Sequence, residues 1–246
     1  DPREPRYREL VAYSPSMELG LRAIEARTRT PSTYVLLAAY AVAVARVMGR
    51  NPSVAQIATS NRFRPGFADA VLQVNQPGIC VVDAAAATFD EVVARAMNAA
   101  TNASFFGYYD PVARDKLLDE VAARLSRPLD ISWHLNDRRA MFPPQDGDSA
   151  PTGPAAEAAL RDALPRTKLF WDRAQPTFDG NLFMQIDSRP MMTSRNSLDE
   201  GLPAVYLEVW TDTQHFALDQ IEALVREMVA VVAAAAFDAN IPTGVG

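Results

Sequence analysis

The stretch STYVLLAAYAVAVARVMGRNPSVAQIATSNRFRP, which covers Ser32–Pro65, decides the fold class. Within it, Val35–Met48 is apolar nearly all round and predicts a buried helix that stops at Gly49. Asn51-Pro52 then predicts a turn, and Val54–Thr59 predicts a strand. A helix without a polar face has to lie in a core, so we expect other elements to surround it.

Helix and strand patterns continue on both sides of this stretch. Ser14 is placed to cap one short amphipathic helix that follows it, and Thr88 is placed to cap another. Val71–Val82 predicts an extended stretch that Pro77-Gly78 interrupts. The other predicted strands are Tyr7–Tyr13, Leu129–Asn136, Lys168–Asp172, Asn181–Asp187 and Ala204–Thr211. The other predicted helices are Phe89–Ser104, Asp110–Leu125, Ala155–Leu164 and Leu218–Phe237.

Strands mixed with helices, without strict βαβ alternation, predict an α/β (mixed α+β) fold. Met141–Pro154 is rich in Pro, Gly, Asp and Ser and predicts an exposed loop. No internal repeat and no low-complexity linker divides the chain. We therefore expect residues 1–246 to form one unit.

The composition excludes several function classes. The 246 residues include 24 Lys+Arg and 30 Asp+Glu, for a net charge of −6, so a broad nucleic-acid-binding surface is not expected. Cys80 is the only cysteine, which excludes an intrachain disulfide and favours a reducing, cytoplasmic location. With only His134 and His215 beside it, no zinc-ligand spacing exists, and we expect no metal site. No signal peptide and no membrane-spanning run is present, and the start at Asp1 predicts a fragment of a longer protein.

No common catalytic motif is found. The sequence lacks a G-x-S-x-G elbow, a P-loop and G-x-G-x-x-G. Asp130, Ser132 and His134 alternate along one predicted strand, but alternate strand residues are about 6.6 Å apart, which separates Asp130 from His134 by about 13 Å. These residues therefore predict a polar row rather than a catalytic triad. Cys80 lies in the apolar run GICVV and is expected to be buried and inert.

The order of several segments matches the pattern of a known family. Ser60-Asn61-Arg62 falls at a Gly/Ser-Arg turn after a strand, and Val74-Asn75 falls at a Val-Asn pair. Val81-Val82-Asp83 and Thr88-Phe89 match the aspartate and the Thr-Phe helix that follow. This order resembles the C-terminal lobe of the condensation domains of nonribosomal peptide synthetases.

The resemblance covers nearly the whole chain but has clear departures. Leu129–Arg139 resembles the family's strand that ends in Asn, and Ala204–Met228 lies where the family has its last strand and closing helix. Thr101–Tyr109 reads TNASFFGYY in place of His-Gln-Asp-x-Pro-Phe-Glu. The catalytic His-His-x-x-x-Asp-Gly motif belongs to the family's N-terminal lobe, and this sequence has no adjacent His pair. We therefore expect a single C-terminal lobe whose N-terminal partner lobe lies outside this chain.

The resemblance also implies a fold and a mechanism. The fold would be a chloramphenicol acetyltransferase-like lobe, a mixed sheet flanked by helices, which forms one wall of a tunnel between two lobes. Carrier proteins would bring the acyl donor and the amine acceptor on phosphopantetheine arms, and no cofactor would bind the lobe directly. The second His of the missing motif would position or deprotonate the amine. No catalytic residue is expected in this chain, and the tunnel candidates are Asn75, Arg62, His134, Asn136 and Ser132.

Other interpretations stay open at this stage. Asn75 can instead bond its own strand end, and Arg62 can belong to a surface ion pair or, with Arg46 and Arg64, meet a phosphopantetheine phosphate. The leading function is half of a condensation domain that forms an amide bond in nonribosomal peptide (antibiotic) biosynthesis. One alternative is a noncatalytic condensation-like domain that recruits a carrier protein or a partner enzyme. Another is an acyltransferase that uses a free alcohol or amine acceptor.

Overall fold

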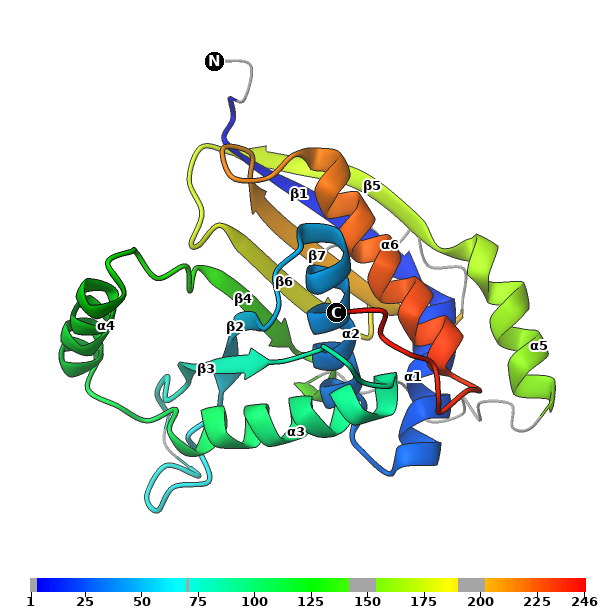
Figure 1. The fold of residues 1–246 in the computed structure, drawn as a ribbon, viewed down its shortest axis with the longest axis horizontal. Helices are drawn as coiled ribbons and strands as arrows, with labels where there is room; N and C mark the ends of the chain where they lie inside the picture. The colour runs from blue at the N-terminus through cyan, green and yellow to red at the C-terminus, as the bar shows by residue number, and fades with distance from the viewer. Residues whose placement is uncertain (1–3, 70, 142–153, 190–201) are drawn as a thin grey trace.

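A seven-stranded mixed β-sheet forms the frame of the protein (Figure 1). The computed structural model describes residues 4–69, 71–141, 154–189 and 202–246. The strand order across the sheet is β3-β2-β4-β6-β7-β1-β5. The strands are β1 (Tyr7–Ser14), β2 (Ser53–Thr59), β3 (Gln76–Val82), β4 (Trp133–Asp137), β5 (Lys168–Gln175), β6 (Leu182–Asp187) and β7 (Val205–Asp212).

Helices flank this sheet, as the sequence predicts. Strand β4 runs parallel to its neighbours β2 and β6, and the other pairs are antiparallel. The α-helices in the described residues are α1 (Pro15–Thr28), α2 (Ser32–Met48), α3 (Phe89–Phe105), α4 (Pro111–Leu125), α5 (Pro154–Ala163) and α6 (Leu218–Ala235). Short 3₁₀ turns are η1 (Arg139–Met141) and η2 (Leu164–Arg166). The expected α/β class, with a mixed sheet flanked by helices, is confirmed.

Helix α2 is the centre of the core. All of its residues from Val35 to Ala45 are buried, and the helix packs between α3 and α6. Gly49 ends it in the left-handed region at φ 64°, where a residue without a Cβ carries no steric penalty. Each large apolar side chain buried here contributes about 1.5–3 kcal/mol of transfer free energy. The apolar run therefore forms the buried helix that its pattern predicts.

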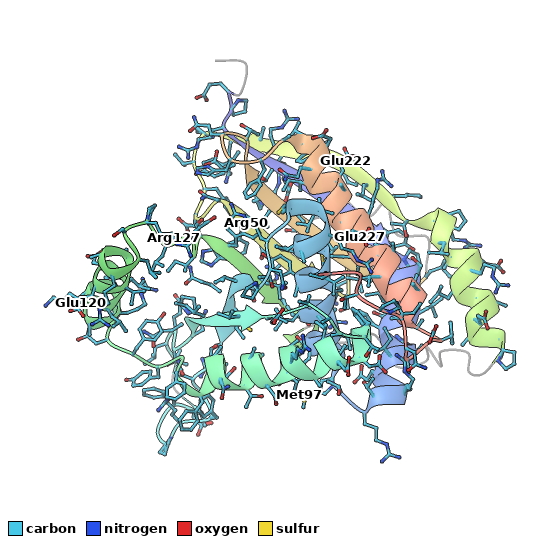
Figure 2. The ribbon with its side chains drawn as sticks, viewed as in Figure 1. Arg50, Met97, Glu120, Arg127, Glu222 and Glu227 are labelled. Atoms are coloured by element: carbon cyan, nitrogen blue, oxygen red, sulfur yellow. The ribbon has the colours of Figure 1, made fainter. Side chains whose placement is uncertain are left out.

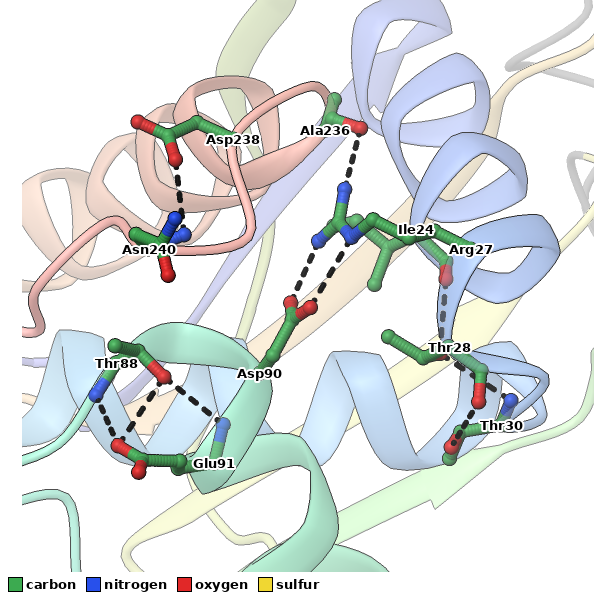
Figure 3. A network of polar contacts seen from close by, with 10 residues as sticks. All are labelled: Ile24, Arg27, Thr28, Thr30, Thr88, Asp90, Glu91, Ala236, Asp238 and Asn240. Carbon is green, nitrogen blue, oxygen red and sulfur yellow. Dashed lines mark hydrogen bonds and ion pairs between the residues drawn. The ribbon is translucent and has the colours of Figure 1, made fainter.

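One arginine connects α1, α3 and the end of α6 (Figure 3). From α1, the Arg27 guanidinium donates to the Asp90 carboxylate of α3 at 2.6 and 3.1 Å, and to the Ala236 carbonyl after α6 at 2.7 Å. Nearby, Thr88 and Glu91 form the predicted capping box at the start of α3. These contacts fix the helix ends relative to one another.

Helix α4 differs from the other long helices, because none of its residues is buried. It stands away from the sheet in Figure 1, and Glu120 points outward from it in Figure 2. Its ends are nevertheless well formed. The Asp110 side chain accepts a hydrogen bond from the Val112 N–H, Pro111 occupies the first turn, and Ser126 closes the helix in the left-handed region. Local capping, rather than packing, defines this helix.

Two strand predictions need correction. Pro77-Gly78 does not interrupt the strand, because β3 runs through both residues and pairs them with Ala58 and Ile57. Proline is tolerated there since β3 lies at the edge of the sheet, where an N–H is needed on one side only. Strand β4 begins at Trp133 rather than at residue 129, because the preceding segment makes no ladder with a neighbouring strand. The predicted loop falls almost entirely on residues 142–153, outside the described residues.

A membrane-spanning test was applied to the described residues. In this part of the chain, no single helix is long and apolar enough to cross a bilayer. Helices α1 and α2 pass the test only when taken together, as a pair bent by 112°.

Candidate functional site

A buried polar side chain lies just after the end of β2. Asn61 is fully buried, and its Nδ2 donates to the Val74 carbonyl at 2.8 Å and to the Gly107 carbonyl at 3.2 Å. The side-chain oxygens of Thr59 and Asn61 are buried without a hydrogen-bond partner among the described residues. One amide thus joins the turn after β2, the approach to β3 and the segment after α3.

Two glycines allow this close approach. A Cβ on Gly78 would lie 2.6 Å from the carbonyl oxygen of Ala103, and one on Gly107 would lie 2.8 Å from Thr59 Cγ2. Real Cβ contacts are not this short, so any larger residue would push α3 away from β3. The junction of β2, β3 and the end of α3 therefore depends on backbone contact.

The structure places Asn75 and Arg62 differently from Asn61. Asn75 is exposed, just before β3. Arg62 is also exposed, and its guanidinium donates to carbonyls of its own loop at Phe67, Ala68 and Leu72. Through these three hydrogen bonds the guanidinium shapes the loop between β2 and β3. Asn61, which lies inside the quoted Ser60-Asn61-Arg62 turn, is the buried member that sequence reasoning missed.

The polar row before and within β4 is partly buried. The Ser132 hydroxyl donates to the Asp130 carboxylate at 2.9 Å, and Arg50 pairs with the other Asp130 oxygen. Figure 2 shows Arg50 beside the segment that leads into β4, and its guanidinium lies 4.6 Å from the Trp133 ring centre. Burial by itself raises the pKa of the Asp130 carboxyl. The hydrogen bonds from Arg50 and Ser132, together with the positive charge of Arg50, outweigh burial, so the pKa is lowered overall. Asp130 is therefore held as a carboxylate.

His134 occupies the centre of this row. Its ring stacks on Phe183 at 5.4 Å between centroids, and its Nε2 lies 3.4 Å from Gln56 Nε2. Burial lowers the pKa of His134, which favours the neutral ring. Because the Gln56 amide nitrogen can only donate, this contact requires an unprotonated Nε2 on His134. Asn136, two residues on, is partly buried and is the register partner of Gln185 in β6.

These candidates form two groups rather than one site. The row Ser132, His134 and Asn136 follows β4, whereas Arg62 and Asn75 flank the loop between β2 and β3. Among the described residues, no contact joins Asp130 to His134, in agreement with the separation along a strand. Burial raises the pKa of the Cys80 thiol to about 12, so it is inert as expected.

An exposed aromatic surface adjoins the turn after β2. We define it by the exposed rings of Phe63, Phe105, Phe106 and Tyr108 and by the half-buried ring of Phe67. Phe67 meets Tyr108 edge-on at 5.5 Å, and Phe105 meets Phe106 in the same way at 5.0 Å. The Arg64 guanidinium lies over Tyr108 at 4.8 Å and donates to the Phe105 carbonyl at 3.2 Å. Phe106 is 71% exposed, and contiguous exposed rings of this kind are typical of an interaction surface.

Two further observations concern metal binding and phosphate binding. In the described ranges, no group of three His, Cys, Asp or Glu residues is placed to hold a metal ion. Arg46 donates to the Thr243 and Pro242 carbonyls and pairs with Glu227, so it ties down the C-terminal segment. Of Arg46, Arg62 and Arg64, which were considered for a phosphate, Arg64 is the one whose guanidinium lies over a ring of the aromatic surface, that of Tyr108.

Comparison with known proteins gives a consistent picture. No family model and no curated protein matches the sequence. Among solved structures, the X-domain from teicoplanin biosynthesis superposes with a TM-score of 0.64 at 15% identity over 98% of this chain. A condensation domain for chain release from the enacyloxin polyketide synthase gives 0.61 at 14% over 95%. The fold is that of condensation domains. SgcC5 of Streptomyces globisporus superposes with a TM-score of 0.62 at 15% identity over 96% of this chain.

The match covers only part of each neighbour. The chain spans 49% of the X-domain, 42% of the enacyloxin domain and 49% of SgcC5. It therefore corresponds to about half of a condensation-domain fold. At these identities the likeness establishes the fold, and roles for individual side chains rest on their geometry.

Proposed function

We propose that this chain is one lobe of a condensation domain that joins a carrier-bound acyl donor to a carrier-bound amine. The observation that carries the proposal is the superposition of nearly the whole chain on less than half of a condensation domain and less than half of an X-domain. A second lobe would supply the histidine that positions or deprotonates the amine. That nitrogen would attack the thioester carbonyl, form the amide and release the donor carrier's thiol.

The residues of this lobe would hold and orient rather than react. The neutral His134 ring and the hydrogen-bonded Ser132 are partly buried polar groups suited to the wall of a tunnel. Asn61 fixes the turn after β2 through two backbone carbonyls. Such fixed groups reduce the reorganisation that a bound substrate would otherwise require.

The aromatic surface is the proposed contact for a carrier protein. Exposed rings supply apolar area, and the Arg64 guanidinium adds positive charge above Tyr108. The segment 101–109 contains no acidic residue, so an acidic partner meets no like charge there. An acidic helical protein with an apolar side chain at its contact face fits this chemistry.

Amide formation tests the proposal directly. Loaded donor and acceptor carriers are incubated with the 246-residue chain and, separately, with the parent polypeptide that contains both lobes. We expect amide to form in the sample with the parent polypeptide and not in the sample with the 246-residue chain. Turnover by the isolated chain would contradict the assignment of the chemistry to a second lobe.

A matched pair of variants tests the carrier contact. In the parent, Phe106→Glu should weaken carrier binding at least tenfold, measured by titration calorimetry. Phe237→Glu also places a carboxylate on an exposed ring position, but it lies after α6 and should leave binding unchanged. Equal effects of the two substitutions would argue against the aromatic surface.

The second candidate is a recruiting domain without amide synthesis. The X-domain match at a TM-score of 0.64 favours it, and another solved structure shows an X-domain in complex with OxyB. The same incubation distinguishes the two functions. A parent that binds a carrier or an oxygenase but forms no amide would support recruitment.

A further inference from the structure

A cavity of about 490 Å³ lies at the edge of the sheet where the parallel strands β4 and β6 end. Asp137, the last residue of β4, and Ser188, which follows β6, line it from the sheet. Helix α1 and the first residues of α2 line it from the helical layer. Ligands of open α/β sheets bind outside the carboxyl ends of parallel strands, in sites of about 300–1,000 Å³. Position and size therefore make this cavity a candidate binding site.

Charged side chains from α1 and from the end of β4 line this cavity. Arg139 donates to the Asp137 carboxylate at 2.7 and 2.9 Å, and the Thr33 hydroxyl donates to the same carboxylate at 2.7 Å. On α1, Arg22 Nε donates to Glu18 Oε1 at 2.7 Å. Each guanidinium group of the described lining is thus paired with a carboxylate, which disfavours an anionic ligand.

Two carboxylates of α1 keep capacity for a ligand. Glu18 is only 8% exposed, and in the described part of the chain Arg22 alone donates to it, through Oε1, so Oε2 remains available. Glu25, about two helical turns further along α1, is exposed and pairs with no described side chain. Together with Asp137 and Arg139, the lining holds three carboxylates and two guanidinium groups, which gives it a net charge of −1. A monocation would balance this charge.

The arrangement of these carboxylates favours an ammonium group over other cations. In the described ranges, no three His, Cys, Asp or Glu side chains surround one point, which argues against a metal ion. A guanidinium group pairs best with both oxygens of a carboxylate, and Arg22 already occupies one oxygen of Glu18. An ammonium group is a compact donor that needs a single oxygen. Leu21, Pro31 and Ala140 add apolar surface for an alkyl chain beside it.

We propose that this cavity binds a small primary alkylammonium compound. The ammonium group donates to Glu18 Oε2, Glu25 adds negative charge on the exposed side of the cavity, and the alkyl chain lies against Leu21. Binding involves no covalent step and does not depend on a second lobe. It can therefore be measured on the 246-residue chain, whatever the outcome of the amide-formation test.

A titration with pentyl compounds that differ only in the head group tests the ligand class. Protonated n-pentylamine is added to the isotope-labelled chain at neutral pH, and the backbone amide shifts of α1 and α2 are followed by NMR. We expect saturable shifts. Pentyltrimethylammonium keeps the charge but cannot donate a hydrogen bond, so it should bind at least about tenfold more weakly. Pentanol and pentanoate should give no saturation in the same range. No saturable shift with n-pentylamine, or equal affinity for pentanoate, would overturn the proposal.

Substitutions in α1 test the residues. Glu18→Gln removes the charge at nearly constant volume and should weaken n-pentylamine binding at least about tenfold. Arg22→Gln removes the competing cation, so binding should become tighter. Glu157→Gln is the matched control and should leave binding unchanged, because Glu157 pairs with Arg161 at the same i,i+4 spacing on α5, outside the cavity lining.

Thermal melting shows which of these variants are folded. If Glu18→Gln does not fold, the opposite sign expected for Arg22→Gln and the head-group series still decide. Unchanged affinity in folded Glu18→Gln, weaker binding in folded Arg22→Gln, or an equal loss in Glu157→Gln would each contradict the proposal.

Discussion

Replacing Asn61 by alanine should destabilise the protein far more than the same change at Asn75. Asn61 is buried and donates to two carbonyls, at Val74 and at Gly107. Asn75 is exposed, just before β3. The pair therefore compares two asparagines of one connection in opposite environments.

The structure sets the size of the effect. A buried acceptor left without a donor costs about 1–3 kcal/mol. The hydrogen bond to the Gly107 carbonyl is buried, so the loss of this bond would cost the full amount. The hydrogen bond to the Val74 carbonyl is only partly buried, so that carbonyl can bind water instead and costs less. We therefore expect Asn61→Ala to lower the free energy of unfolding by about 2–4 kcal/mol. For a chain of this length that corresponds to about 4–16 °C in Tm.

Urea denaturation followed by circular dichroism measures the difference. Asn75→Ala should change the free energy of unfolding by less than about 0.5 kcal/mol, as surface substitutions usually do. Asn61→Leu fills the same space without a donor or a charge, so it separates the hydrogen bonds from the cavity. A loss below about 0.5 kcal/mol for Asn61→Ala, or a larger loss for Asn75→Ala, would refute this reasoning.

Two other predictions concern single residues. Burial lowers the pKa of His134, so the unfolded chain binds a proton more readily, and stability should fall as the pH drops through about 6.5. His134→Gln should flatten this pH dependence, and an unchanged Tm-against-pH curve would contradict the role of the ring. Gly78→Ala places a Cβ 2.6 Å from the Ala103 carbonyl oxygen and should cost about 1–3 kcal/mol in urea denaturation. Gly246→Ala meets nothing within 4 Å and should be neutral; equal effects would show that α3 adjusts freely.

Elements with local signals were predictable from the sequence. The apolar run of α2, the Ser14 cap of α1 and the capping box at Thr88 all stand where the pattern places them. Each depends on residues within a few positions of one another. Local patterning is therefore sufficient to find these helices and to order them along the chain.

Features that depend on distant partners were not predictable in the same way. Whether Pro77 breaks a strand depends on β3 being an edge, which is a property of the whole sheet. The burial of Asn61 depends on Gly107, which is 46 residues away. The family resemblance directed attention to Asn75. The polar residue that joins the turn after β2 to the segment after α3 is instead Asn61.

The exposed position of α4 has a consequence for the dynamics of the protein. A helix without buried residues is held by its own hydrogen bonds and its caps, which alone are marginal at 15 residues. Its amides should therefore exchange with solvent deuterium through local opening, independently of the slow global unfolding that governs α2. Opening of Pro111–Leu125 exposes no fully buried side chain, so it carries a much smaller penalty of apolar hydration than opening of α2. The protein thus consists of a cooperative unit around α2 and a helix that can melt and re-form while that unit stays folded.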